Sequence, residues 1–279
     1  MDREFVLGVL VLAIAGPVML AFGARRPRVV DDDCAGLQER RLWAALLTPV
    51  LTAAVAVAAL AGWAVLEPEH AESVPTPWIV VAVPFALVWC RALARAVRAA
   101  MPPHAAGPAE TVGLLRPRVR IAPELAAVLD DTALAAAVAH EEAHARRRDP
   151  LRIWAAQLAT DLQWPMRAAN ERFEAWAAAL ELARDEDARR GGVDGADLAA
   201  AVVAAARLQH DRRSAVAGLA AGDAALLRER VDRLLAPLAA PLPWARRWPH
   251  TIAGVMVVAV VLGAIFGESL VRLILLGQA

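Results

Sequence analysis

Long stretches without a charged side chain alternate with charged segments along this chain. Residues 5–23 and 42–66 contain no acidic or basic residue. Residues 78–93 form a shorter apolar run that contains Pro84, and residues 251–276 form a further long one. Because an α-helix rises 1.5 Å per residue, such runs can cross about 30 Å of hydrocarbon. The pattern predicts four transmembrane helices.

The distribution of arginine orients these helices. The loop at residues 24–41 is rich in arginine, whereas residues 67–76 contain none. Basic residues concentrate in cytoplasmic loops, so we expect the loop at 24–41 inside the cell and both termini outside. Residues 1–93 would then form a three-span region, residues 94–249 a cytoplasmic module, and residues 250–279 a fourth membrane helix with a short outer tail. The expected location is the plasma membrane.

The cytoplasmic module begins with a pattern typical of a β-hairpin. Residues 110–123 alternate bulky and polar side chains, and Gly113 and Pro117 interrupt them. This alternation predicts a short hairpin whose turn lies near Arg116 and Pro117. The sequence therefore predicts a mainly α membrane protein, in which four transmembrane helices accompany a helical module with a small β-hairpin.

Capping residues and helix breakers divide the rest of the module into helices. One helix is predicted from about residue 130 to 148, a second begins at Asp149-Pro150, and Pro165 ends it. A third runs from near Met166 to Arg190, where Gly191 and Gly192 follow. We interpret Asp149 as a helix cap and not as a metal ligand, because Asp followed by Pro is typical of a helix start.

Composition and net charge argue against some classes of function. The chain is 58% hydrophobic with a mean hydropathy of +0.43, and its 30 basic and 30 acidic residues give no net charge. This balance argues against direct binding of nucleic acid. Cys34 and Cys90 have no metal-ligand spacing, and we expect no disulfide between them.

The pentapeptide His140-Glu141-Glu142-Ala143-His144 carries the most specific chemistry of the sequence. On a helix, residues four apart share a face, so His140 and His144 can present two imidazoles to one metal ion. Glu141 lies beside them, directed toward the attacking water. This arrangement is typical of zinc peptidases, in which zinc has three protein ligands and an open position. A third ligand is therefore required.

Glu181 and Asp185 are the candidates to complete the site. They are four residues apart on the third predicted helix, so Glu181 can reach the metal while Asp185 hydrogen-bonds a ligating imidazole. The alternative is an ordinary solvated face, because Glu186 and Asp187 follow directly. Spacing alone leaves both interpretations open.

Three segments resemble the BlaR/MecR family of integral-membrane zinc metallopeptidases. They are the run GLLRPRVRIAP at 113–123, the run LAAAVAHEEAHARRRDP at 134–150, and ELARD at 181–185. The resemblance implies that His140, His144 and Glu181 bind Zn²⁺, that Glu141 is the general base, and that Asp185 supports an imidazole ligand. It also implies hydrolysis of a cytoplasmic protein substrate, namely a DNA-binding repressor of the BlaI type.

The sequence departs from that family at two places. Arg184 stands where the family usually has a small residue or cysteine, which predicts different packing near the third ligand. The sequence reaches Ala279 soon after the fourth predicted span, so we expect no extracellular penicillin-binding sensor domain. Two other functions remain open: a quality-control membrane protease similar to HtpX and the CAAX prenyl proteases, and a non-catalytic membrane scaffold for signalling.

Overall fold

The computed structural model describes residues 3–24, 34–66, 76–100, 107–214 and 221–238. These residues form a mainly helical fold, as the sequence predicts, with one two-stranded sheet among them. In chain order the elements are α1 (Arg3–Gly23), α2 (Ala35–Leu66), α3 (Thr76–Ala99), β1 (Ala109–Val112), β2 (Arg118–Ile121), α4 (Pro123–Val128), α5 (Asp131–Arg147), α6 (Asp149–Leu162), α7 (Arg167–Arg190), α8 (Gly195–Ser214) and α9 (Ala221–Leu235).

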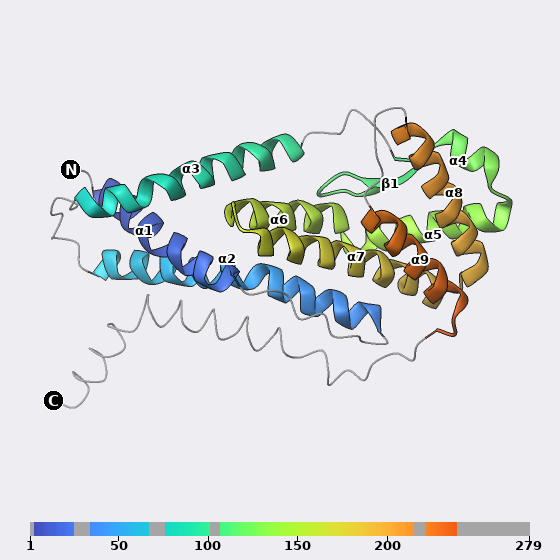
Figure 1. Cartoon of the computed structure of the whole chain (residues 1–279), viewed down its shortest axis with the longest axis horizontal. Helices are drawn as coiled ribbons and strands as arrows, with labels where there is room; N and C mark the ends of the chain where they lie inside the picture. Colours follow the sequence, from blue (N-terminus) through green and yellow to red (C-terminus); the bar gives the residue numbers. More distant parts are fainter. Residues whose placement is uncertain (1–2, 25–33, 67–75, 101–106, 215–220, 239–279) are drawn as a thin grey trace.

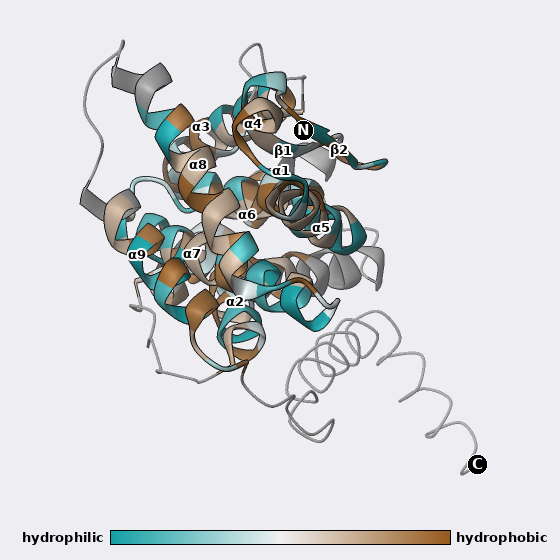
Figure 2. Cartoon of the chain, turned by 90° about the vertical axis from the view of Figure 1, so that its right-hand side faces the viewer, coloured by the Kyte–Doolittle hydropathy of each residue, from teal (hydrophilic) through white to brown (hydrophobic). Residues whose placement is uncertain are grey.

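The helices form two regions that share α6 and α7. Helices α1 and α3 lie at one end of the molecule, and α4, α5, α8 and α9 lie at the other (Figure 1). α2 extends from the first region along α6 and α7. Hydrophobic and hydrophilic residues are interspersed along the helices of the module (Figure 2).

Helix α3 has the length and composition of a membrane span. Among the described residues, it is the one helix that is both long and apolar enough to cross a membrane. It also leaves large apolar side chains exposed, including Val80, Val83 and Leu87. Exposed apolar surface of this kind is typical of contact with lipid or with another protein. The helix continues to Ala99, beyond the predicted end of the span at residue 93.

The other predicted spans have different outcomes. Residues 5–23 and 42–66 are helical, in α1 and α2. The fourth predicted span, at residues 251–276, lies outside the described residues. The four-span arrangement therefore remains an expectation, whereas the helical class is confirmed.

The first half of α2 belongs to the core of the module. Leu42 and Leu46 are buried in one hydrophobic cluster with residues of α6 and α7, including Trp176 and Leu180. The ring centroids of Trp43 and Trp176 are 5.0 Å apart. The core of the module therefore includes residues of α2, although the hydropathy pattern places residues 1–93 in the membrane region and the start of the module at residue 94. Hydropathy alone could not show this, because an apolar run has the same composition whether protein or lipid covers it.

The predicted β-hairpin is present. β1 pairs antiparallel with β2, with Ala109 opposite Ile121 and Val112 opposite Arg118. Gly113 follows β1 with a φ of 96°, and a Cβ atom there would lie 2.7 Å from the carbonyl oxygen of Arg116. The turn therefore requires glycine, both for its backbone angle and for space.

The helix that carries the histidine motif is fixed at both ends. The side chain of Asp130 accepts a hydrogen bond of 2.8 Å from the backbone N–H of Ala133 and so caps α5. At the other end, Arg148 has a left-handed backbone with a φ of 54°. This one residue separates α5 from α6, so the first turn of α6 lies directly beside the last turn of α5.

We predict that Leu46→Ala lowers the free energy of unfolding by about 2–5 kcal/mol, because it leaves a cavity in the shared core. Leu46 is 1% exposed, whereas Leu51 on the same helix is 45% exposed, so Leu51→Ala is the matched control with an expected change within about 0.5 kcal/mol. Urea unfolding in mild detergent, followed by tryptophan fluorescence, measures both. Equal small losses would contradict the packing of α2 against α6 and α7.

Candidate metal centre

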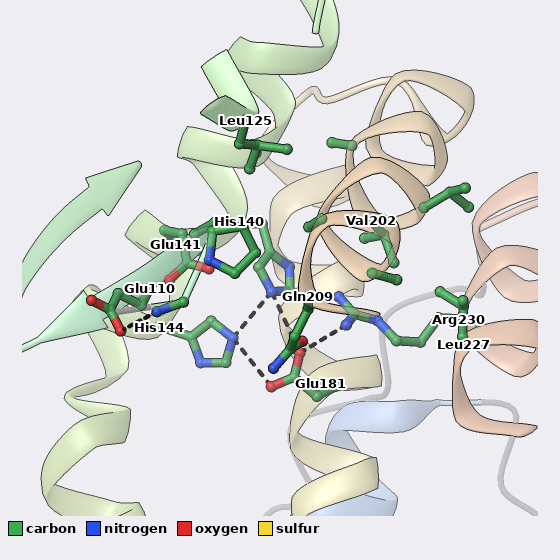
Figure 3. A pocket seen from close by; sticks show the side chains of 18 of the residues that line it. Glu110, Leu125, His140, Glu141, His144, Glu181, Val202, Gln209, Leu227 and Arg230 are labelled. Carbon is green, nitrogen blue, oxygen red and sulfur yellow. Dashed lines mark hydrogen bonds and ion pairs between the residues drawn. The ribbon is translucent and has the colours of Figure 1, made fainter. Parts of the chain in front are cut away.

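The structure brings His140, His144 and Glu181 together (Figure 3). The two Nε2 atoms of the histidines are 3.1 Å apart. The carboxylate oxygens of Glu181 lie 3.6 Å from Nε2 of His140 and 3.7 Å from Nε2 of His144. Ligand atoms around a tetrahedral zinc ion with bonds of 2.0–2.1 Å are about 3.3 Å apart. The three side chains therefore form a candidate metal-binding triad.

The other nitrogen of each imidazole faces a carboxylate. Nδ1 of His140 lies 2.9 Å from Oδ1 of Asp185, and Nδ1 of His144 lies 2.9 Å from Oδ2 of Asp149. The contact at His144 is a hydrogen bond, whereas Nδ1 of His140 lies close to Asp185 without hydrogen-bond geometry. When each Nδ1 carries the proton, facing its carboxylate, each Nε2 is left with a lone pair. Two lone pairs and the Glu181 carboxylate then converge on one point. This donor set fits a metal cation.

The carboxylates also favour positive charge on His140. Burial by itself lowers the pKa of His140, but the carboxylates of Asp185 and Glu181 outweigh it and raise the pKa to about 9. A proton and a metal ion therefore compete for the same electron-rich position. The raised pKa and the geometry point to the same physical cause, which is negative charge concentrated around two buried imidazoles.

The role of Asp149 differs from the one predicted. The N-cap of α6 is Arg148, and the fully buried Asp149 turns its side chain toward His144 instead of capping the helix. Burial raises the pKa of Asp149, but the bonds to His144 and Arg184 lower it to about 2. The abrupt left-handed turn at Arg148 causes this placement. The signal in the sequence that could have predicted this role is the position of Asp149, just after the helix that carries the histidine motif.

Arg184 supports Asp149 and does not disturb the third ligand. Its Nε and Nη2 donate to the two oxygens of Asp149, the latter at 3.2 Å, and its Nη1 donates to Asp187 at 2.8 Å. The side chain is almost fully buried. The large residue at this position therefore binds the carboxylate that holds His144, on the side away from the three candidate ligands.

Arg230, which the sequence did not single out, holds Glu181 and Asp185. Its Nη1 lies 3.0 Å from Glu181, and its Nε and Nη2 each donate to Asp185 at 2.8 Å. Burial raises the pKa of Glu181, but Arg230 and the histidines outweigh it and keep the carboxylate ionised. No local motif in α9 marks this residue, because its partners lie on α7, which is distant in sequence.

Glu141 is positioned by the hairpin. Oγ1 of Thr111 on β1 lies 2.8 Å from Oε2 of Glu141 and 2.8 Å from its backbone carbonyl oxygen. Glu141 is buried and lies beside the two histidines, outside the triad (Figure 3). Its carboxylate is therefore not one of the three candidate ligands, although it lines the same cavity.

The candidate metal centre lies in the wall of a cavity of about 940 Å³. The polar side chains of the site form one part of the lining, together with residues 107–111 of the hairpin region. Apolar side chains of α8 and α9, among them Leu198, Val202 and Leu227, form another part. The cavity is therefore large enough for several residues of an extended peptide.

Comparisons with protein families, with curated proteins and with solved structures find no match to this chain. The class defined by the fold and the site is that of a mainly helical protein with a candidate His₂Glu metal centre and an adjacent glutamate.

We predict that Asp185→Asn weakens metal binding about 10- to 100-fold, the usual effect of removing a carboxylate that orients a ligating imidazole. Asp187→Asn is the matched control, because Asp187 lies on the same helix and binds Arg147 and Arg184 but contacts neither histidine. Zinc titration against a chromophoric competitor measures both variants. A loss of affinity in Asp187→Asn equal to that in Asp185→Asn would show that the effect is not specific to His140.

Proposed function

We propose that this protein is a membrane-embedded zinc metalloendopeptidase that hydrolyses peptide bonds of a cytoplasmic protein. The observation that carries the proposal is the convergence of His140, His144 and Glu181 on one point, with Glu141 beside them. A site that only bound metal for stability would have no need of a buried carboxylate next to the ligands. Such a carboxylate is the group that a hydrolytic zinc site requires.

The donor set favours zinc among the common divalent ions. Two imidazole nitrogens and one carboxylate are typical ligands of catalytic zinc, whereas magnesium and calcium prefer sites made entirely of oxygen. Zinc bound there would polarise the scissile carbonyl group and lower the pKa of a water molecule toward about 7. The protein residues supply the remaining requirements of the reaction.

Each residue of the site then has a distinct task. His140, His144 and Glu181 hold the metal, while Asp185 and Asp149 fix the imidazoles so that Nε2 is the ligating atom. Glu141 accepts a proton from the attacking water and delivers it to the leaving amine. Thr111 keeps the Glu141 carboxylate in place for both transfers.

The hairpin provides a place for the substrate backbone. β1 pairs with β2 along one edge, and residues 107–111 line the cavity next to Glu141. An extended peptide can add to the other edge of β1 as a further strand. Its scissile bond would then lie beside the candidate metal centre, because Thr111 of β1 contacts Glu141 directly.

The membrane arrangement is part of the proposal. The length and exposed apolar surface of α3, together with the arginine-rich segment at 24–41, favour a multi-pass protein of the plasma membrane with a cytoplasmic module and outer termini. The sequence predicts a loop for this segment, but its residues from Ala35 onward belong to α2. The substrate suggested by the BlaR/MecR resemblance is a DNA-binding repressor of the BlaI type. The module would contact that protein and not the nucleic acid itself.

We predict that Glu141→Gln retains zinc but lowers hydrolysis of a purified BlaI-type repressor, and of β-casein as a general substrate, by at least about 10²-fold. Glutamine keeps the shape and the hydrogen bond from Thr111 but removes the proton acceptor. Elemental analysis measures bound metal, and His144→Ala is the control that should lose it. Undiminished cleavage by Glu141→Gln would overturn the catalytic role, and loss of zinc would make Glu141 structural.

We predict that the module faces the cytoplasm. With Cys34 and Cys90 replaced by serine, a cysteine at Val128, which is 60% exposed in the module, should react with a membrane-impermeant maleimide only after lysis. A cysteine at Glu69, in the arginine-free segment between two predicted spans, should react in intact cells. Labelling of the Val128 position in intact cells would contradict the proposed topology.

A further inference from the structure

A carboxylate of α2 is buried and connected to the candidate metal centre through Arg152 and Asp149, although the proposed reaction does not use it. Glu39 is 5% exposed, in a helix whose next residues enter the apolar core. Its Oε1 accepts a hydrogen bond of 3.2 Å from Nε1 of Trp176 and forms an ion pair with Nη2 of Arg152. A carboxylate removed from water is costly unless it is paired, so this pairing holds the start of α2 in one position.

Arg152 connects Glu39 to a metal ligand. While Nη2 binds Glu39, Nη1 donates to Oδ1 of Asp149 at 3.0 Å. The other oxygen of Asp149 lies 2.9 Å from Nδ1 of His144. A continuous path of hydrogen bonds therefore runs from Glu39 through Arg152 and Asp149 to His144, and it joins α2, α6 and α5.

The guanidinium group of Arg152 has little freedom to move along this path. Its Cζ atom lies 4.9 Å from the ring centroid of Trp43 and 5.8 Å from that of Trp176. Both ends of its planar fork are occupied by carboxylates, and one of its aromatic neighbours lies on α2 itself. A change in the position of α2 is thus transmitted to Arg152 by Glu39 and by Trp43 together.

Glu39 also governs how strongly Arg152 acts on Asp149. Asp149 accepts from Arg184, Arg152 and His144 at once. While the Glu39 carboxylate contacts Arg152, the positive charge of Arg152 is shared between two carboxylates. Without that carboxylate, Arg152 interacts with Asp149 alone. The stronger interaction makes Asp149 a poorer acceptor for the Nδ1–H of His144. A weaker hydrogen bond at Nδ1 makes Nε2 a poorer donor to a metal.

We propose that Glu39 is a positioning residue for the metal centre, acting through Arg152 and Asp149 on His144, so that metal affinity depends on the contact between Glu39 and Arg152. This inference rests on the proposed function of the same site. Because coupling between two equilibria is reciprocal, occupancy of the metal site also stabilises this contact between α2 and α6. α2 continues to Leu66 through the apolar run, so a change in the apolar half of this helix has a defined route to His144.

The test compares zinc affinities of the full-length chain in detergent, after removal of metal with a chelator and titration against a chromophoric competitor. Glu39→Gln keeps the size of the side chain and an acceptor for Trp176 but removes the charge. We expect its apparent Kd for zinc to rise about 3- to 10-fold, less than the 10- to 100-fold effect of a group that touches the imidazole directly. The visible absorption spectrum of the cobalt-loaded variant should shift as well.

Glu186→Gln is the matched control. Glu186 also holds the start of α2, since its Oε1 accepts a hydrogen bond of 2.8 Å from the backbone N–H of Ala35, and its other oxygen pairs with Arg190. Within the described part of the chain, the polar partners of Glu186 are Cys34, Ala35 and Arg190, and they do not include Arg152, Asp149 or His144. We expect its zinc affinity to remain within about twofold of the wild type, because a bond outside the path should leave His144 unchanged.

A double-mutant cycle separates action through Asp149 from a general loosening of the fold. In the Asp149→Asn background, adding Glu39→Gln should cause no further change in zinc affinity, because the path is already broken. Should Glu39→Gln fail to fold, Arg152→Lys replaces it, since a lysine keeps the charge but cannot bridge both carboxylates, and the same rise in Kd is expected.

The outcomes separate this inference from the proposed function. If the wild type binds one zinc and Glu39→Gln binds it equally well, the positioning role is wrong and the peptidase proposal stands. Equal weakening by Glu39→Gln and Glu186→Gln, or full additivity in the cycle, would also overturn the positioning role. If the wild type binds no more zinc than His144→Ala, both the proposed function and this inference fail.

Discussion

The Nε2 atoms of His140 and His144 lie 3.1 Å apart, a separation that either a shared proton or a metal ion between the two nitrogens can satisfy. This constraint organises the site. The helix spacing of His140 and His144 brings the rings together, and the carboxylates behind them direct the Nε2 atoms inward. Glu181 adds a third negative group on the open side. A proton on His140 satisfies part of this arrangement, whereas a divalent metal would satisfy both imidazoles and Glu181 at once.

The charges around the site are balanced in pairs. Asp149 of α6 is paired with Arg184 of α7 and with Arg152 of its own helix, and Asp185 of α7 is paired with Arg230 of α9. Buried ions of this kind contribute little net stability, because desolvation offsets much of their attraction, but removing one partner leaves an uncompensated charge. Their value here is geometric, since Asp149–Arg184 ties α6 to α7 and Asp185–Arg230 ties α7 to α9, which fixes the two carboxylates that lie behind the imidazoles.

The sequence predicts those features of the site that depend on local periodicity. The spacing of His140 and His144, the hairpin, and the helix starting near Met166 follow from patterns within a few residues, and the structure places all of them close to the predicted positions. The partners that come from distant segments do not follow from such patterns. Arg230 and Glu39 reach the site from helices far from the motif in the chain, and no spacing rule relates them to it.

The run of apolar residues at 42–66 is a second case in which the sequence pattern does not reveal the packing partners. Leu42 and Leu46 are apolar because α6 and α7 cover them, whereas Leu51 is apolar and exposed. A hydropathy pattern records that each residue avoids water but not what replaces the water. One continuous helix can therefore start inside a folded module and continue into an apolar segment, and α2 does so without a break in sequence character at the transition.

Helix α6 gives this arrangement a mechanical basis. At its first residue, Asp149 contacts the ligand His144 and, through Arg152, the start of α2. Toward its other end, about 18 Å away at 1.5 Å per residue, Asp161 binds Arg95 of the candidate membrane helix α3 at 3.0 Å. A helix is stiff over this length, so α6 is a rigid connection between α3 and the metal centre. α2 is thus connected to Asp149 through Arg152 at the start of α6, and α3 contacts Asp161 toward the other end of the same helix.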